Sequence, residues 1–162
     1  MTESDILRQA DDVLAACRAR KLKLAVAESC TGGLLAGALT AIAGSSDVFE
    51  RGFATYSNEA KSELLGVPMM LIEAHGAVSA EVARAMADGA LAKSRAQLTA
   101  SITGVAGPGG GSDAKPVGLV FIGCAGRFRD TVVERHLFPG DRTAIRHASV
   151  MAALALLARR VA

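Results

Sequence analysis

The chain contains no tryptophan, and aromatic residues make up only 4% of its 162 residues. Apolar residues nevertheless account for 51% of the sequence, which is enough for a sizeable core. That core must therefore consist mainly of alanine, leucine, valine and isoleucine. The length is typical of one domain, and we assign residues 1–162 to a single domain.

Cysteine is also scarce, and the three cysteines are Cys17, Cys30 and Cys124. No disulfide framework follows from an odd number, and a reducing compartment is consistent with it. No apolar run reaches the ~18 residues that a membrane span requires. The acidic, polar residues 1–5 are unlike a signal peptide. We therefore expect a cytoplasmic protein with no membrane partner.

The sequence has no excess of one charge, because 18 Lys and Arg residues face 16 Asp and Glu residues, a net charge of +2. This near balance gives no support to a nucleic-acid partner. The positive charge is uneven, however, since seven arginines and three acidic residues lie between Arg127 and the C-terminus. Such a region can attract a small anion, although a solvated face is the commoner explanation.

Metal-binding patterns are missing too. The sequence has no Cys-x-x-Cys and no His-x-x-x-His, and the histidines His75, His136 and His147 are isolated. We expect no metal and no other cofactor. None of the three histidines has a carboxylate at an instructive spacing, so a Ser-His-Asp triad is not predicted.

Hydrophobic periodicity predicts helices that alternate with strands. Helices are expected at residues 3–20, 34–42, 58–66, 79–94 and from 141 onwards, with a further helical turn or two at 68–75. Strands are expected at residues 24–27, 49–57, 98–103, 117–125 and 131–138. Asn58, Ser79 and Asp141 are the expected helix caps. The order predicts an α/β domain with helices on both faces of the sheet, and a hairpin of the last two strands makes that sheet mixed.

The first strand runs into the segment Glu28-Ser29-Cys30-Thr31-Gly32-Gly33, which precedes a helix. Ligands bind at the carboxyl ends of strands in open α/β sheets, and free amides at a helix start can stabilise an oxyanion. Ser29 is therefore a candidate nucleophile, and Glu28, Thr31, Gly32 and Gly33 are candidate oxyanion or substrate-binding residues. An equally compatible interpretation is that Ser29 or Thr31 only caps the helix.

The strand expected at residues 98–103 enters a glycine-dense segment, residues 104–111. Glycine lets a backbone approach a ligand closely, so Thr103, Gly104 and Gly107 are candidate substrate-binding residues. The segment is no Walker loop, because no Gly-Lys-Ser/Thr follows, and no dinucleotide fingerprint, because a strand is expected next. By itself it is more typical of a mobile loop.

A serine nucleophile needs a base, and lysine is the alternative to histidine. Lys61 follows Tyr56-Ser57-Asn58-Glu59-Ala60, so Tyr56 at a strand end and Lys61 in the next helical turn can face one cleft, with Asn58 between them. A desolvated lysine near other cations can lose its proton near neutral pH. An ordinary surface lysine is the commoner case.

Arg142 and Arg146 lie four residues apart at the start of the last expected helix, so they share a face. A helix N-terminus favours anions, and two guanidinium groups add charge and fork geometry. A phosphate or carboxylate site is one interpretation. A helix face with salt bridges is the other.

Taken together, these segments resemble the CinA C-terminal domain family, also called competence/damage-inducible protein. The resemblance rests, in chain order, on residues 27–33, 44–46, 51–53, 55–61, 75–79, 103–110, 115–118 and 138–142. It covers nearly the whole chain, and no signature segment departs from the pattern. Larger members carry an additional N-terminal domain, and the start of this chain at its first helix leads us to expect the stand-alone form.

The resemblance implies a three-layer α/β/α sandwich around a mixed, mostly parallel sheet. It also implies nicotinamide-nucleotide amidase activity, in which the carboxamide of nicotinamide mononucleotide is hydrolysed to nicotinate mononucleotide and ammonia. Ser29, Lys61 with Tyr56, and the amides of residues 31–33 can then supply the nucleophile, the proton shuttle and the oxyanion site. The substrate phosphate has two candidate sites, the Arg142 region and the glycine loop.

Three alternatives stay open at this point. The same fold can use Cys30 as the nucleophile, or the chain can be a nucleotide-binding or interaction module with a silent site. A short-chain reductase also uses Ser, Tyr and Lys, but Tyr56 and Lys61 are five apart and no N-terminal Gly-x-Gly-x-x-Gly is present. Beyond its nucleotide substrate, a homo-oligomer is the one partner we keep open.

Overall fold

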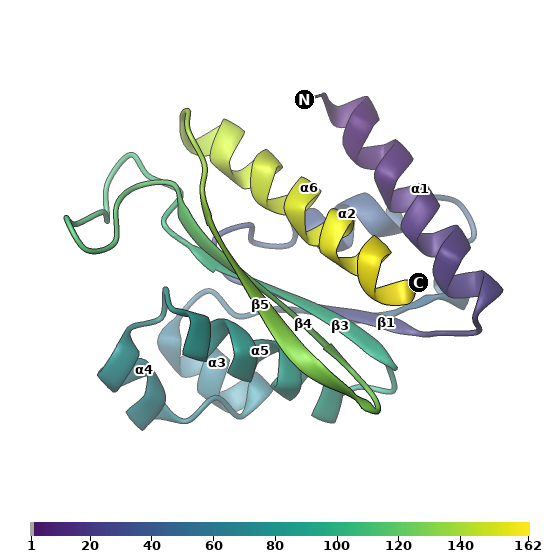
Figure 1. The fold of residues 1–162 in the computed structure, drawn as a ribbon, viewed down its shortest axis with the longest axis horizontal. Coiled ribbons are helices and arrows are strands. Elements are labelled where there is room, and N and C mark those ends of the chain that lie inside the picture. Colours follow the sequence, from purple (N-terminus) through teal and green to yellow (C-terminus); the bar gives the residue numbers. More distant parts are fainter. Residues whose placement is uncertain (1) are drawn as a thin grey trace.

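A five-stranded sheet in the order β2-β1-β3-β4-β5 forms the centre of the computed structural model, which describes residues 2–162 (Figure 1). The strands are β1 (Leu24–Glu28), β2 (Phe49–Ala54), β3 (Leu98–Gly104), β4 (Leu119–Gly126) and β5 (Arg129–Leu137). β1 is parallel to both of its neighbours, whereas β4 is antiparallel to β3 and β5. β4 therefore runs against the other four strands, and the predicted mixed, mostly parallel sheet is confirmed.

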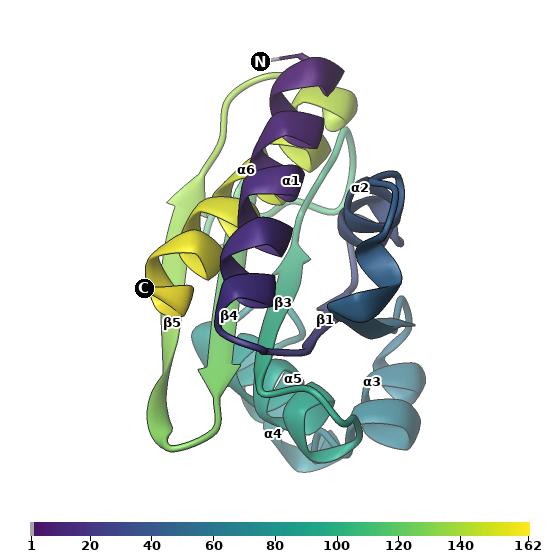
Figure 2. The ribbon, with the colours of Figure 1, turned by 90° about the vertical axis from the view of Figure 1, so that its right-hand side faces the viewer.

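Helices cover both faces of this sheet. One layer contains α1 (Glu3–Ala19), α2 (Leu34–Thr40) and α6 (Arg142–Val161), and the other contains α3 (Asn58–Leu65), α4 (Met69–His75) and α5 (Ala80–Ala92) (Figure 1). A short 3-10 helix, η1 (Ser45–Asp47), precedes β2. Figure 2 shows α1 lying beside α6 on one side of the sheet. The predicted three-layer α/β/α arrangement is confirmed. No helix within residues 2–162 has the length and apolar character that crossing a membrane requires.

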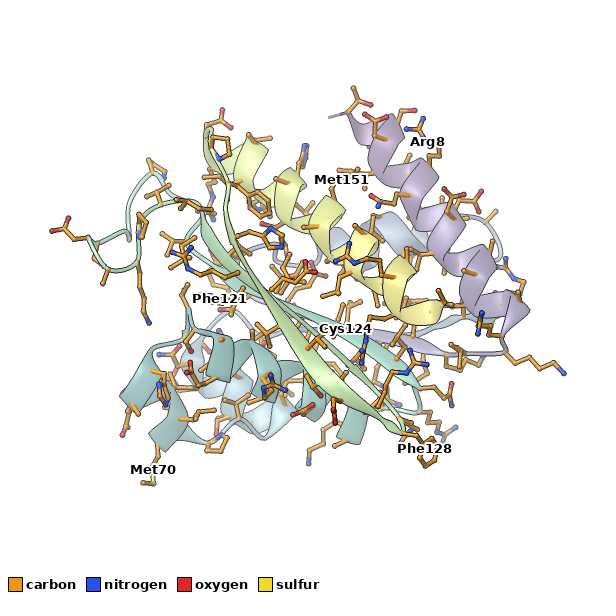
Figure 3. All side chains as sticks on the ribbon, in the orientation of Figure 1. Arg8, Met70, Phe121, Cys124, Phe128 and Met151 are labelled. Atoms are coloured by element: carbon orange, nitrogen blue, oxygen red, sulfur yellow. The ribbon has the colours of Figure 1, made fainter. Side chains whose placement is uncertain are left out.

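The core is aliphatic, as the composition predicts. Leu14, Leu39, Ile122 and Leu154 belong to the larger buried cluster, whereas Val82 and Met86 belong to the smaller one around α5. No aromatic side chain is buried in the described part of the chain. In Figure 3, Phe128 projects from the tip of the β4–β5 hairpin and Met70 from the outer side of α4.

Two predicted boundaries shift near the end of β2. The strand ends at Ala54 instead of residue 57, and Ser57, not Asn58, caps α3 by accepting a hydrogen bond from the Ala60 amide at 3.0 Å. Ser57 is the cap because its backbone is still extended, whereas Asn58 is already the first helical residue. The predicted caps Ser79 and Asp141 are confirmed at α5 and α6.

The strand order creates a topological switch point between β1 and β3. The chain leaves β1 toward β2 on one side and leaves β3 toward β4 on the other, which opens a crevice at the carboxyl ends of β1 and β3. The Ser29 amide donates to the Ile102 carbonyl at 2.9 Å, and the Thr55 amide donates to the Glu28 carbonyl at 2.9 Å. Ser29 therefore lies at the mouth of this crevice, between the ends of β2 and β3.

A close approach between α5 and α3 depends on Gly89, because a Cβ added there would lie 2.0 Å from the Leu65 carbonyl oxygen. Overpacking of this kind costs about 1–3 kcal/mol, so we expect Gly89→Ala to lower the free energy of unfolding by that amount. Gly37, an exposed residue within α2, has no atom within 4 Å of an added Cβ and provides the matched control. Gly37→Ala should raise stability by about 0.4–1 kcal/mol. Urea unfolding measures both, and a Gly89→Ala protein as stable as Gly37→Ala would contradict the packing argument.

Candidate active site

The side chains of Ser29 and Lys61 meet across 32 residues of sequence, because the turn after β1 faces the first turns of α3. Lys61 Nζ lies 3.0 Å from Ser29 Oγ. The same nitrogen donates to the backbone carbonyls of Thr55 at 2.9 Å, Tyr56 at 3.3 Å and Ser57 at 3.4 Å. In the neutral amine, two protons can remain on these carbonyls while the lone pair faces the Ser29 hydroxyl. The arrangement therefore fits a nucleophile paired with its base.

Lys61 is not the surface residue that its type would suggest. It is 1% exposed, and within residues 2–162 no carboxylate lies within 4 Å of its amine. Burial lowers the pKa of the Lys61 ammonium, and the nearby Cys30 thiol and Glu59 carboxylate only partly oppose this. Of the two influences on the Lys61 pKa that the sequence suggested, desolvation and neighbouring positive charge, desolvation is the one that acts. A buried lysine without an ion-pair partner is a functional-site signature.

The segment after Ser29 forms a tight turn. The Gly32 amide donates to the Ser29 carbonyl at 3.0 Å, which occupies one of the amides expected to bind an oxyanion. The amides of Cys30, Thr31 and Gly33 donate to no acceptor in the described chain. Gly33 is the N-cap of α2 and has no side-chain capping bond, so neither Ser29 nor Thr31 acts as the helix cap considered above.

The Glu28 carboxylate caps the start of α2 instead. Its carboxylate accepts hydrogen bonds from the Thr31 hydroxyl at 2.6 Å and from the amides of Leu35 and Ala36 at 2.8 and 3.0 Å. The side chain is 1% exposed. Both carboxylate oxygens are thus used inside the protein, and the geometry does not support our placement of Glu28 and Thr31 among the residues that touch substrate.

The two arginines of α6 separate, although they share a helix face. Arg142 donates to the Gly107 carbonyl at 2.8 Å and to the Tyr56 hydroxyl at 3.1 Å. Arg146 instead contacts the turn that follows Ser29, where it donates to the carbonyls of Cys30 and Thr31, both at 3.1 Å. Only Arg142 therefore reaches the cavity beside Ser29.

That cavity has a volume of about 280 Å³ and lies at the switch point. Its lining contains the following predicted site residues: Ser29, Tyr56, Asn58, Lys61, Thr103, Gly104, Gly107 and Arg142. Thr31, Gly32, Gly33 and Arg146 do not line it, and Gly33 lines a separate cavity between α1, α2 and α6. The structure thus brings together residues from four separate segments of the sequence.

The glycine segment forms one wall of the cavity. At Gly104, a Cβ would lie 2.8 Å from the Leu119 carbonyl oxygen, so this position tolerates no side chain. Thr103 is held by a hydrogen bond from its hydroxyl to the Ala77 carbonyl at 2.8 Å. Sequence reasoning did not select Ala77 and Val78, which also line the cavity, since apolar residues in a loop carry no chemical signal.

Tyr56 and Cys30 have less direct roles than the dyad formed by Ser29 and Lys61. The Tyr56 hydroxyl contacts Arg142, whereas only its backbone carbonyl contacts Lys61. Burial raises the pKa of the Cys30 thiol to about 11, so little thiolate exists at neutral pH.

None of the three histidines lines the cavity, and residues 2–162 contain no group of three His, Cys, Asp or Glu residues that could hold a metal ion.

The comparison with protein families supports the resemblance seen in the motifs. A family model described as the CinA C-terminal domain matches residues 7–161. The chain is 52% identical over 143 residues to a putative competence-damage inducible protein of Caldicellulosiruptor bescii, covering 88% of this chain. It spans only 34% of that relative's length, about a third.

A shorter relative matches end to end. The chain is 46% identical over 157 residues to the nicotinamide-nucleotide amidohydrolase PncC of Escherichia coli K12, covering 97% of this chain and 95% of that protein. Among solved structures, the competence/damage inducible protein CihA of Agrobacterium tumefaciens superposes with a TM-score of 0.93 at 47% identity. That match covers 94% of this chain and 93% of the other.

Proposed function

Because the chain belongs to the CinA C-terminal domain family, we propose that it hydrolyses the carboxamide of nicotinamide mononucleotide to nicotinate mononucleotide and ammonia. The observation that carries the proposal is the contact between the buried Lys61 amine and Ser29 Oγ at the mouth of a cavity. The end-to-end similarity to a protein named nicotinamide-nucleotide amidohydrolase supports the choice of substrate.

The reaction proceeds in two stages with Ser29 as the nucleophile. Ser29 Oγ attacks the carboxamide carbon while its proton passes to the neutral Lys61 amine, and the carbonyl electron pair moves onto oxygen. When that pair returns, the C–N bond breaks, and the Lys61 ammonium gives its proton to the leaving nitrogen. Ammonia departs, and an ester between the nicotinoyl group and Ser29 remains.

Water then completes the turnover. Lys61 takes a proton from water as the water oxygen attacks the ester carbon, and it returns a proton to Ser29 Oγ when the ester bond breaks. The product leaves as nicotinate mononucleotide, so one amide and one water become one carboxylic acid and one ammonia. Lys61 acts as base and acid in turn, which requires a pKa close to the working pH.

The oxyanion and the substrate phosphate have separate partners. The free amide of Cys30, which lines the cavity, is the donor that we assign to the oxyanion, since the residue after a nucleophile commonly fills this role. Arg142 is the guanidinium at the cavity, and we assign the substrate phosphate to it. Tyr56 and Asn58 then contact substrate as lining residues, and Tyr56 is no longer assigned as a base.

Ammonia release from nicotinamide mononucleotide tests both the function and the nucleophile. We expect Ser29→Ala to lose about a thousandfold or more in kcat, as nucleophile removal does in other serine hydrolases. Cys30→Ala should keep most of the rate, because Cys30 packs as a small apolar residue. An inactive Cys30→Ala with an active Ser29→Ala would reverse the assignment, and a wild-type protein that releases no ammonia would refute the substrate.

The pH dependence tests Lys61 as the base. Its neutral form is active, so kcat/KM should rise with pH along a limb set by the lowered pKa of Lys61. Lys61→Arg keeps the charge but cannot give up its proton, so we expect it to lose roughly a hundredfold or more, as does Lys61→Ala. The exposed Lys93→Arg is the matched control and should keep the wild-type rate. Substantial turnover by Lys61→Arg would leave Lys61 only an electrostatic role.

Substrate preference tests Arg142 as the phosphate ligand. A charge-assisted hydrogen bond contributes about 1.5–3 kcal/mol, so the mononucleotide should exceed free nicotinamide in kcat/KM by about ten- to a hundredfold through this contact. Arg142→Ala should lower the ratio of kcat/KM for the mononucleotide to kcat/KM for free nicotinamide. Arg159→Ala, at the exposed far end of α6, should leave this ratio unchanged. An unchanged ratio in Arg142→Ala would place the phosphate elsewhere, with the glycine loop next.

A further inference from the structure

The loop between β3 and β4, residues 105–118, is held to the rest of the protein more firmly than its glycine content predicts. We propose that Lys115, which lies outside the cavity, is a positioning residue that keeps this loop against the cavity and so sets the KM for substrate. This role rests on the proposed function, because the KM is the one for nicotinamide mononucleotide. It also gives a purpose to the segment 115–118, which the proposed reaction leaves unused.

The loop is closed at its base. The Val105 amide donates to the Leu119 carbonyl at 2.9 Å, and the Gly118 amide donates to the Val105 carbonyl at 2.8 Å. The two ends are therefore adjacent, as in the compact Ω-loops that often carry function. Residues 108–114 are exposed, and the loop projects beyond the end of the sheet (Figure 1). The sheet thus holds the base of the loop but not its remainder.

The loop has two arms, residues 105–111 and residues 112–118, and they pack against each other. A Cβ at Gly107, in the first arm, would lie 2.5 Å from Val117 Cγ1 in the second. A Cβ at Gly111 would lie 2.9 Å from the backbone nitrogen of the same valine. Glycine therefore brings the arms into direct contact, and a restraint on the second arm also restrains the first.

Of the two arms, the first faces the cavity. Gly107, Gly109 and Gly110 line the cavity, whereas none of residues 112–118 does. The amides of Gly109 and Gly110 donate to no acceptor in the described chain, so they remain available to a substrate. The position of the first arm thus decides whether these amides reach a bound nucleotide.

Two cationic side chains connect the loop, beyond its base, to other elements. Arg142 donates to the Gly107 carbonyl at 2.8 Å, and Lys115 Nζ donates to the His75 carbonyl. Arg142 is the residue that we assign to the substrate phosphate, so substrate binding changes the contacts of its guanidinium. Lys115 has no such second partner, and its hydrogen bond can persist throughout turnover.

The carbonyl that Lys115 reaches belongs to a second wall of the cavity. His75 is followed by Gly76, where a Cβ would lie 2.4 Å from Lys115 Nζ, so glycine leaves the space that the ammonium occupies. The next two residues, Ala77 and Val78, line the cavity. This wall is itself anchored, because the Ala77 carbonyl accepts the hydrogen bond from β3 described above. Lys115 therefore links two walls of the cavity.

Removal of the Lys115 ammonium should weaken substrate binding and leave the chemical step intact. We expect Lys115→Met, which keeps the aliphatic stem, to raise the KM for nicotinamide mononucleotide about tenfold, the low end for one charge-assisted hydrogen bond. The value of kcat should stay near wild type, because the contact between Ser29 and Lys61 does not involve the loop. Lys115→Arg can still donate to the carbonyl and should restore the KM. Lys93→Met, at the exposed end of α5, is the matched control and should change neither constant.

The order of the loop provides a readout that needs no substrate. In NMR relaxation, the amides of Gly109 and Val117 should have order parameters near the rigid value of about 0.85 in wild type and below about 0.6 in Lys115→Met. The Gly118 amide, at the base, should stay protected from hydrogen exchange, which distinguishes a released loop from an unfolded one. Lys115→Gln, whose side chain is too short to reach the carbonyl, supplies the test if Lys115→Met does not fold.

The outcomes separate the role of Lys115 from the choice of substrate. If wild type releases no ammonia but the loop becomes mobile in Lys115→Met, the substrate is refuted and the restraint by Lys115 is supported. Where ammonia is released, a wild-type KM in folded Lys115→Met would overturn the role, whatever the mobility of the loop. Wild-type order parameters in that variant would overturn it too, as would a fall in kcat at unchanged KM, since the residue would then act on the chemical step.

Discussion

Burial of the Lys61 amine without a carboxylate partner costs free energy, and the surrounding chain supplies what water would otherwise provide. Three consecutive carbonyls, those of Thr55, Tyr56 and Ser57, turn toward the amine. They can do so because β2 ends at Ala54 and α3 begins only at Asn58. A longer strand would pair these carbonyls with a neighbour and leave the amine unsatisfied. Burial of the Lys61 amine therefore requires that β2 end at Ala54.

The turn after β1 meets the second requirement, which is to hold Ser29 against that amine. The Glu28 carboxylate holds the turn by accepting hydrogen bonds from the Thr31 hydroxyl and from the first amides of α2. Arg146, on α6, holds it by donating to the carbonyls of Cys30 and Thr31. Neither side chain lines the cavity. The groups that line the cavity thus rest on a second set of polar contacts that substrate does not reach, as precise sites generally require.

Much of the architecture could be predicted from periodicity, because long amphipathic helices and apolar strands leave clear patterns. Ser29 and Lys61 were predicted as nucleophile and base, whereas the shared cleft was predicted for Tyr56 and Lys61. The expectation that Lys61 lies at the surface, as lysines usually do, was wrong. An eight-residue helix such as α3 is too short for its sequence pattern to show which of its faces is buried. The roles of Glu28 and Arg146 were missed because both bind backbone groups, which look the same in every sequence. The cytoplasmic location, the absence of a cofactor and a homo-oligomer remain predictions.

The dyad joins the two helical layers of the sandwich. Ser29 precedes α2 on one face of the sheet, and Lys61 is carried by α3 on the other. The position of α3 depends in turn on α5, because Gly89 admits the Leu65 carbonyl at a distance that no side chain would allow. Ser29 therefore lacks its base in any chain in which the two helical layers have not both docked on the sheet. Nucleophilic reactivity is thus a property of the complete sandwich, and the local sequence around Ser29 is not sufficient for it.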